Sequence, residues 1–188
     1  MARGLGRTTQ RTLVALLRAV NVGGTGKMSM RDLAAICSTV GFADVRTYIQ
    51  SGNVVFRTDR SSADAAAALK DGLIKSRGSG VDVLVRDAGE LETLLAANPF
   101  PTAPPAKVVV IFCSETVPPG LLARVTGPDG EQIVVCEREL YVYYPVGIGA
   151  SQLKLPKLPG VTTARNMNTV SKLVEICREL PPPGRQRA

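Results

Sequence analysis

The apolar run Leu13-Val14-Ala15-Leu16-Leu17 constrains the fold of this chain more than any other segment. It lies inside the nearly all-apolar stretch Thr12–Val20 and lacks the alternation that marks a strand with one face in water. Such a run is typical of a central strand that is covered on at least one face. We therefore expect a strand in the middle of a sheet here, and not at its edge.

The elements predicted after this strand follow a recognisable order. Ser29 has the pattern of a helix N-cap with Asp32 three residues later, and Gly41 is a suitable end for that helix. The further predicted elements are a strand over Val45–Gln50, a turn at Ser51-Gly52, a strand over Asn53–Thr58, a helix over Ser61–Arg77 and a strand over Val81–Arg86. This order predicts an α+β, ferredoxin-like βαββαβ fold, in which a four-stranded antiparallel sheet carries both helices on one face.

The second half of the chain predicts a smaller α+β subdomain. A capping box at Asp87 and Glu90 opens a helix that ends before Pro99. The elements expected after it are a strand over Lys107–Cys113, a short helix over Pro118–Val125, a hairpin over Ile133–Cys136 and Leu140–Tyr144, and a final helix over Val170–Leu180. Whether this half is a degenerate copy of the first stays open, because no sequence repeat supports a duplication.

These elements divide the chain into five parts. Residues 1–11 and 181–188 form flexible tails, 12–97 the ferredoxin-like domain, 98–106 a Pro-rich connector and 107–180 the second subdomain. The net charge of +7 is concentrated in the tails, which carry five arginines. Without them, 18 basic residues face 16 acidic ones, a net charge of +2. Solvated tails are thus favoured over a binding surface for polyanions. With neither a secretory signal nor an apolar run of about 18 residues, we expect a cytoplasmic protein without membrane contact.

Histidine is absent, and this excludes catalytic Ser-His-Asp and Cys-His groups and most transition-metal sites. The four cysteines, Cys37, Cys113, Cys136 and Cys177, form no close pair and predict reduced, mostly buried thiols. We expect no metal and no cofactor. Whether the protein is an enzyme stays open, and any acid–base step would need a carboxylate that the sequence does not single out.

A glycine-rich loop over Asn21–Met28 follows the first strand. A P-loop requires Gly where Asn21 stands and Ser or Thr where Met28 stands, so the loop is not one. Its backbone N–H groups and Lys27 are still suited to an anion, although glycines can also serve only to permit a tight turn. In a ferredoxin-like sheet this loop and the Ser51-Gly52 turn lie at the same edge, roughly 10 Å apart.

The predicted site combines these turns with a segment near the other end of the chain. We expect Arg18, Asn21, Lys27, Ser51, Asn53, Arg165 and Asn166 to form one accessible polar site without a nearby acidic residue. Asn168 or Thr169 is the expected N-cap of the last helix, which leaves Arg165 and Asn166 free for an anion. Replacing Arg18 or Arg165 by Ala is expected to weaken ligand binding and to leave the melting temperature largely intact.

These motifs resemble those of an uncharacterised bacterial family, domain of unknown function 1697, over Thr12–Leu180. The family pattern matches Arg18, Asn21, Gly23, Gly24, Lys27, the run Gln50 to Asn53 with Gly52, and the run Thr163 to Asn166. The chain departs from it at Ala19, commonly Gly, and at Met167, commonly Trp. The resemblance implies the ferredoxin-like fold and brings no reaction with it.

Three functions remain in competition. The first is binding of, or chemistry on, a small anionic ligand such as a nucleotide or a phosphorylated metabolite. The second is nucleic-acid binding, although the first strand has no aromatic residue and the third has only Phe56. The third is a structural or protein-interaction module that offers Tyr141, Tyr143 and Tyr144 to a partner. The oligomeric state stays open.

Overall fold

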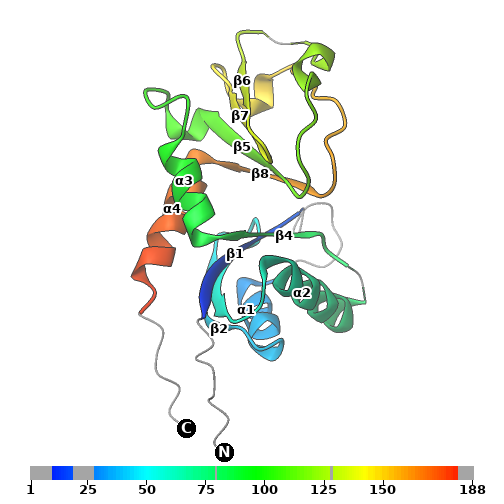
Figure 1. The fold of residues 1–188 in the computed structure, drawn as a ribbon, viewed down its shortest axis with the longest axis vertical. Helices are drawn as coiled ribbons and strands as arrows, with labels where there is room; N and C mark the ends of the chain where they lie inside the picture. Colours follow the sequence, from blue (N-terminus) through cyan, green and yellow to red (C-terminus); the bar gives the residue numbers. More distant parts are fainter. Residues whose placement is uncertain (1–9, 19–27, 79, 128, 182–188) are drawn as a thin grey trace, which may run out of the picture.

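A computed structural model describes residues 10–18, 28–78, 80–127 and 129–181. The elements of the first unit are β1 (Arg11–Leu17), α1 (Met30–Thr39), β2 (Ala43–Tyr48), β3 (Asn53–Thr58), α2 (Ser62–Arg77) and β4 (Val83–Asp87). Its sheet has the order β2-β3-β1-β4, and every neighbouring pair is antiparallel. The predicted ferredoxin-like fold is confirmed, with both helices on one face of the sheet (Figure 1).

Strand β1 is central and buried on both faces. Leu13 and Leu17 point into the core beneath α1 and α2, where Leu33 and Leu69 also lie. Val14 and Leu16 point the opposite way, into a second core. This two-sided burial explains why the strand is apolar at every position from Leu13 to Leu17 instead of at alternate ones. Ser29 caps α1 as expected, since its hydroxyl accepts a hydrogen bond from the backbone N–H of Asp32 at 3.0 Å.

The second unit repeats the strand order of the first. Its elements are α3 (Ala88–Ala96), the 3₁₀ turn η1 (Pro105–Lys107), β5 (Val108–Cys113), the 3₁₀ turn η2 (Leu121–Arg124), β6 (Gln132–Val135), β7 (Glu139–Tyr143), the 3₁₀ turn η3 (Ile148–Ala150), β8 (Thr162–Asn166) and α4 (Met167–Glu179). The sheet order is β6-β7-β5-β8, again antiparallel throughout. Thus β5 to β8 correspond to β1 to β4. Helix α4 corresponds to α3, and the short turns η2 and η3 stand in the places of α1 and α2.

One predicted boundary in the second unit is wrong. No strand was expected at Thr162–Asn166, yet these residues form the edge strand β8 and pair with β5. Helix α4 therefore begins at Met167, and its N-cap is Asn166 instead of Asn168 or Thr169. The strand escapes detection because the side chains that it buries, Thr163 and Arg165, are polar.

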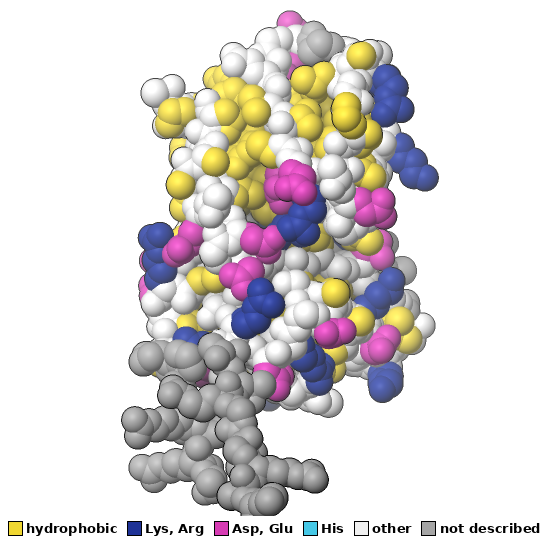
Figure 2. All heavy atoms as spheres, in the orientation of Figure 1, with side chains coloured by type: hydrophobic (Ala, Val, Ile, Leu, Met, Phe, Trp, Pro, Cys, Tyr) yellow, Lys and Arg dark blue, Asp and Glu magenta, His cyan; other side chains and the backbone are white. Residues whose placement is uncertain are grey.

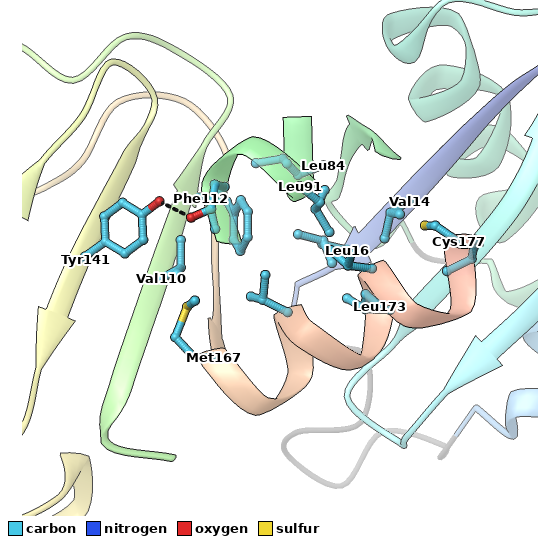
Figure 3. Close-up of a cluster of buried hydrophobic side chains, with 14 of the residues drawn as sticks. Val14, Leu16, Leu84, Leu91, Val110, Phe112, Tyr141, Met167, Leu173 and Cys177 are labelled. Atoms are coloured by element: carbon cyan, nitrogen blue, oxygen red, sulfur yellow. Dashed lines mark hydrogen bonds between the residues drawn. The ribbon is translucent and has the colours of Figure 1, made fainter. Parts of the chain in front are cut away.

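Helices α3 and α4 form the core that joins the two units. Leu91 and Leu94 of α3 and Leu173 of α4 pack with β1 and β3 of the first sheet and with β5 and β7 of the second (Figure 3). The hydroxyl of the buried Tyr141 donates a 2.7 Å hydrogen bond to the carbonyl of Leu94, which fixes β7 against α3. The units are consequently held by a continuous apolar core, and the chain between them does not act as a free linker.

Three further expectations can be compared with the structure. Arg11, placed in the N-terminal tail by the sequence, is the first residue of β1 and forms a 3.1 Å ion pair with Asp87. Cys37, Cys113 and Cys177 are buried, as expected, and Cys136 is exposed. Within the described ranges, no helix is both long enough and apolar enough to cross a membrane.

Candidate functional site

Arg165 lies at the contact between the units. It belongs to β8 of the second unit, is 8% exposed, and extends to the end of β1 and the β2–β3 turn of the first unit. Its Nη2 donates to the backbone carbonyls of Leu17 at 2.9 Å, Ser51 at 3.1 Å and Gly52 at 3.3 Å. Its Nε donates to Oδ1 of Asn53 at 2.5 Å. The Ser51–Asn53 turn and the segment around Arg165, which are 112 residues apart in the chain, therefore meet as predicted.

The hydrogen bonds of Arg165 use its full donor capacity. Nη1 donates to the hydroxyl of Thr163 at 2.8 Å and to the carbonyl of Ala164 at 2.7 Å. A guanidinium has five N–H donors, and six oxygen atoms surround this one. Arg165 is thus a buried structural partner. It contacts no ligand through a spare N–H group, which corrects the expectation of an arginine that faces an open cleft.

The charge of Arg165 has no carboxylate partner. None of the ion pairs among the described residues includes it, and all six acceptors are neutral oxygens. Burial lowers the pKa of the guanidinium to about 10. Arg165 is still charged at neutral pH, and its charge is stabilised by the dipoles of neutral carbonyl, amide and hydroxyl groups.

Arg86 makes the corresponding contact in the opposite direction. It lies in β4 of the first unit, is 3% exposed, and extends to the second unit. Its Nη2 donates to the carbonyl of Cys113, the last residue of β5, at 2.7 Å. Its Nε and Nη2 donate to Oε1 of Glu139, the first residue of β7, at 3.0 and 2.9 Å.

The two arginines occupy equivalent positions in the two units. Each stands immediately before the N-cap of the following helix, which is Asp87 for α3 and Asn166 for α4. Each donates from Nη2 to the last carbonyl of the other unit's first strand, and from Nε to the first side chain of its third strand. The chemical difference is at that side chain: Arg86 meets the carboxylate of Glu139, whereas Arg165 meets the amide of Asn53.

The structure places the other predicted site residues as follows. Arg18 is exposed and lies 3.7 Å from the carboxylate of Asp82, so an acidic residue is nearby, contrary to expectation. Ser51 is exposed, and its hydroxyl accepts a 3.0 Å hydrogen bond from Nδ2 of the buried Asn53. Asn166 serves as N-cap, because its Oδ1 accepts from the backbone N–H of Thr169 at 3.0 Å. Asn21, Gly23, Gly24 and Lys27 lie outside the described residues.

Sequence reasoning missed the partner contact of Arg86 and Glu139. A signal for it exists in the chain. Arg86-Asp87 and Arg165-Asn166 are both followed by apolar residues four and seven positions after the cap, Leu91 and Leu94 in one case and Val170 and Leu173 in the other. An alignment of these two segments alone would have paired the arginines.

Comparisons with known proteins agree with this architecture. The conserved bacterial protein SP0830 from Streptococcus pneumoniae has a similar structure, with a TM-score of 0.72 at 20% sequence identity over 90% of this chain and 99% of that one. At this identity the likeness concerns the fold. A search of curated proteins finds no match. The family model described as "Protein of unknown function (DUF1697)" matches residues 11–141, and the chain belongs to that family.

Proposed function

We propose that the protein binds a small anionic ligand, such as a nucleotide or a phosphorylated metabolite, at the edge formed by Arg18 and the turn Ser51–Asn53, with Arg165 beneath it. We call this the Asn53 edge. The observation that carries the proposal is a difference between the two equivalent arginines of the molecule. Arg86 has an internal carboxylate, while the equivalent Arg165 has only Asn53. The Asn53 edge therefore has one uncompensated positive charge.

The charge of Arg165 acts on a ligand through space, because its N–H groups are all engaged. At an effective dielectric constant of about 20, a single negative charge roughly 7 Å away gains on the order of 2 kcal/mol. Direct donors come from the surface of the edge. The Ser51 hydroxyl accepts from Asn53 and keeps its own proton for donation, and the exposed Arg18, which lies 3.7 Å from Asp82, provides a further guanidinium. The glycine loop predicted from the sequence begins three residues after Arg18 in the chain and includes Lys27.

The structure gives less support to nucleic-acid binding. RNA-binding sheets of this type use aromatic residues on the face opposite the helices. Here that face carries Val14 and Val55 and is covered by α3 and α4. Phe56 points to the other side, where it is buried and stacks on Phe42 with 4.0 Å between ring centroids. On the face seen in Figure 2, acidic and basic side chains are interspersed instead of forming a basic patch.

A tyrosine surface for a protein partner is also poorly supported. Tyr141 and Tyr144 are 2% and 6% exposed, and Tyr143 packs against Phe100 with 5.8 Å between ring centroids. These tyrosines are part of the core and its margin. The small anionic ligand is the function that the described contacts favour.

The proposal is tested with Asn53→Asp, which gives Arg165 the carboxylate that Arg86 already has. Asn98→Asp in the connector is the matched control, because it makes the same chemical change away from the Asn53 edge. Isothermal titration with inorganic phosphate and with ATP should show affinity at least about tenfold weaker for Asn53→Asp, given ~1.4 kcal/mol per tenfold. The control should bind like the unmodified protein.

The outcome that contradicts the proposal is equally direct. If Asn53→Asp binds phosphate and ATP as tightly as the control, the charge of Arg165 has no part in binding. Asn53 Nδ2 also donates to the carbonyl of Tyr48 at 2.9 Å, and the aspartate loses this bond. Circular dichroism of both variants therefore accompanies the titrations, to establish that they are compared in the folded state.

A further inference from the structure

We infer that occupancy of the Asn53 edge controls how tightly the two units pack on each other. This inference rests on the proposed function. Arg165 comes from the second unit, whereas the acceptors at Leu17, Ser51, Gly52 and Asn53 all come from the first. The positive charge is thus at the Asn53 edge only while the units are packed together.

The coupling follows from this placement. When the units separate, Arg165 leaves the edge and takes with it the field that attracts an anion. An anion consequently binds the packed state more tightly than the separated state. Because coupling between two equilibria is reciprocal, binding of the anion must stabilise the packed state by the same factor.

The two arginine contacts differ in their sensitivity to a ligand. The Arg86 contact is complete, since Glu139 neutralises the guanidinium with two hydrogen bonds. The Arg165 contact joins a buried cation to neutral oxygens alone, and such a cation is costly to bury. An external anion therefore stabilises the Arg165 contact more than the Arg86 contact. The Arg165 contact is thus the ligand-sensitive part of the interface.

Helices α3 and α4 report on unit packing. They form the shared core through Leu91, Leu94 and Leu173, and the Nε of Arg178 donates to Glu92 at 2.8 Å between them. Helices α1 and α2 cover the far face of the first sheet and belong to a different core. Amide hydrogen exchange in the two helix pairs thus separates loosening of the interface from loosening of the first unit.

The first experiment compares exchange of the intact protein with and without inorganic phosphate, at ionic strength matched with sodium chloride. At phosphate concentrations ten times the dissociation constant, mass action predicts exchange about elevenfold slower in α3 and α4 if only the packed state binds. Exchange in α1 and α2 should change much less. If calorimetry shows phosphate binding and exchange in α3 and α4 stays the same, the inference is overturned and the proposed function stands.

A tethered charge tests the inference independently of any ligand. Ser51 is exposed, and Arg165 donates to its backbone carbonyl, so Ser51→Asp places a carboxylate at the Asn53 edge. This variant should slow exchange in α3 and α4 in the absence of phosphate, and Ser51→Asn, its uncharged equivalent, should not. Equal exchange in the two variants overturns the inference. Absence of phosphate or nucleotide binding by calorimetry instead overturns the proposed function, whatever the exchange of Ser51→Asp.

Discussion

At the scale of single residues, Arg165 is both a structural partner and a source of charge. Its Nε and Nη2 groups join β8 to the end of β1 and to the β2–β3 turn, while Nη1 donates within β8. Arg18 has neither property, since it is exposed and its ion pair with Asp82 spans 3.7 Å. The two arginines, which the sequence treats as equivalent members of one site, therefore have different roles.

Substitution separates these roles. Arg165→Ala removes the guanidinium donor from the carbonyl of Ser51 and from Oδ1 of Asn53, while the carbonyl of Gly52 still accepts from the N–H of Leu17 at 2.9 Å. We expect the free energy of unfolding to fall by about 3–5 kcal/mol. Arg18→Ala should change it by less than about 1 kcal/mol, as is usual for exposed pairs. Urea denaturation measures both values. Equal stability of the two variants would contradict the hydrogen bonds assigned to Arg165.

The pKa of Arg165 also predicts a pH dependence. Its folded-state pKa of about 10 lies below the ordinary value of 12.5, so the folded protein loses this proton first as the pH rises. Sulfate, which does not titrate in this range, should bind with constant affinity from about pH 6 to 9 and more weakly as the pH passes about 10. Stability depends on this group only above about pH 10, where unfolding takes up a proton and rising pH favours the folded state. Titration calorimetry across the pH series tests the binding curve, and a fall centred near pH 8 would point to a different group.

At the scale of secondary-structure elements, the two units use the same device to begin their last helix. A buried arginine is the last but one residue of the edge strand, and the final residue of that strand caps the helix, Asp87 for α3 and Asn166 for α4. The cap thus fixes the direction in which the preceding arginine leaves the strand. The residue that begins each helix therefore directly follows the arginine that contacts the other unit.

Removal of the cap should have a measurable cost. Asn166→Ala loses the bond from the N–H of Thr169, and we expect the free energy of unfolding to fall by about 1 kcal/mol. Asn166→Asp should retain this stability, because aspartate caps equally well and suits the positive end of the helix dipole. Chemical denaturation of Asn166→Ala and Asn166→Asp measures the two free energies of unfolding. If both variants lose the same amount, the cap contributes little and α4 is held by packing alone.

The elements also show what the sequence can predict. The continuous apolar run locates β1, the tight turn at Ser51-Gly52 locates the start of β3, and N-caps locate α1 and α2. The same reasoning fails at β8, where Thr163 and Arg165 are the buried residues and no apolar period exists. The predicted sheet topology is sufficient to place the β2–β3 turn near the end of β1. The approach of Arg165 to that turn depends on packing between the units, which no local pattern encodes.

At the scale of the whole molecule, two units with the same strand order share one core. Helices α3 and α4 lie between the sheets, and β4 and β8 run across the middle of the molecule (Figure 1). The first unit covers its outer face with α1 and α2, whereas the described residues that cover the second contain only short 3₁₀ turns. The two units thus share a strand order and a reciprocal arginine contact.

The distribution of charge over the molecule gives a further prediction. Removing residues 1–9 and 182–188 eliminates Arg3, Arg7, Arg185 and Arg187 and keeps Arg11, which pairs with Asp87. The net charge falls from +7 to +3, since 19 basic residues then face 16 acidic ones. We expect weaker retention on heparin and an unchanged melting temperature. Equal retention at moderate salt would place a polyanion-binding surface in the folded body.

Most of the hydrogen bonds that Arg86 and Arg165 donate to the other unit are accepted by main-chain carbonyls. The carbonyls of Leu17, Ser51, Gly52 and Cys113 accept from Arg165 or Arg86, and every amino acid supplies a carbonyl. Replacing Leu17, Ser51 or Cys113 leaves the acceptors in place as long as the strands end where they do, whereas Gly52 has a φ of 78° that favours glycine. The interface thus places little demand on most of the side chains around the two arginines. Two units can therefore have the same contact geometry while they share little sequence.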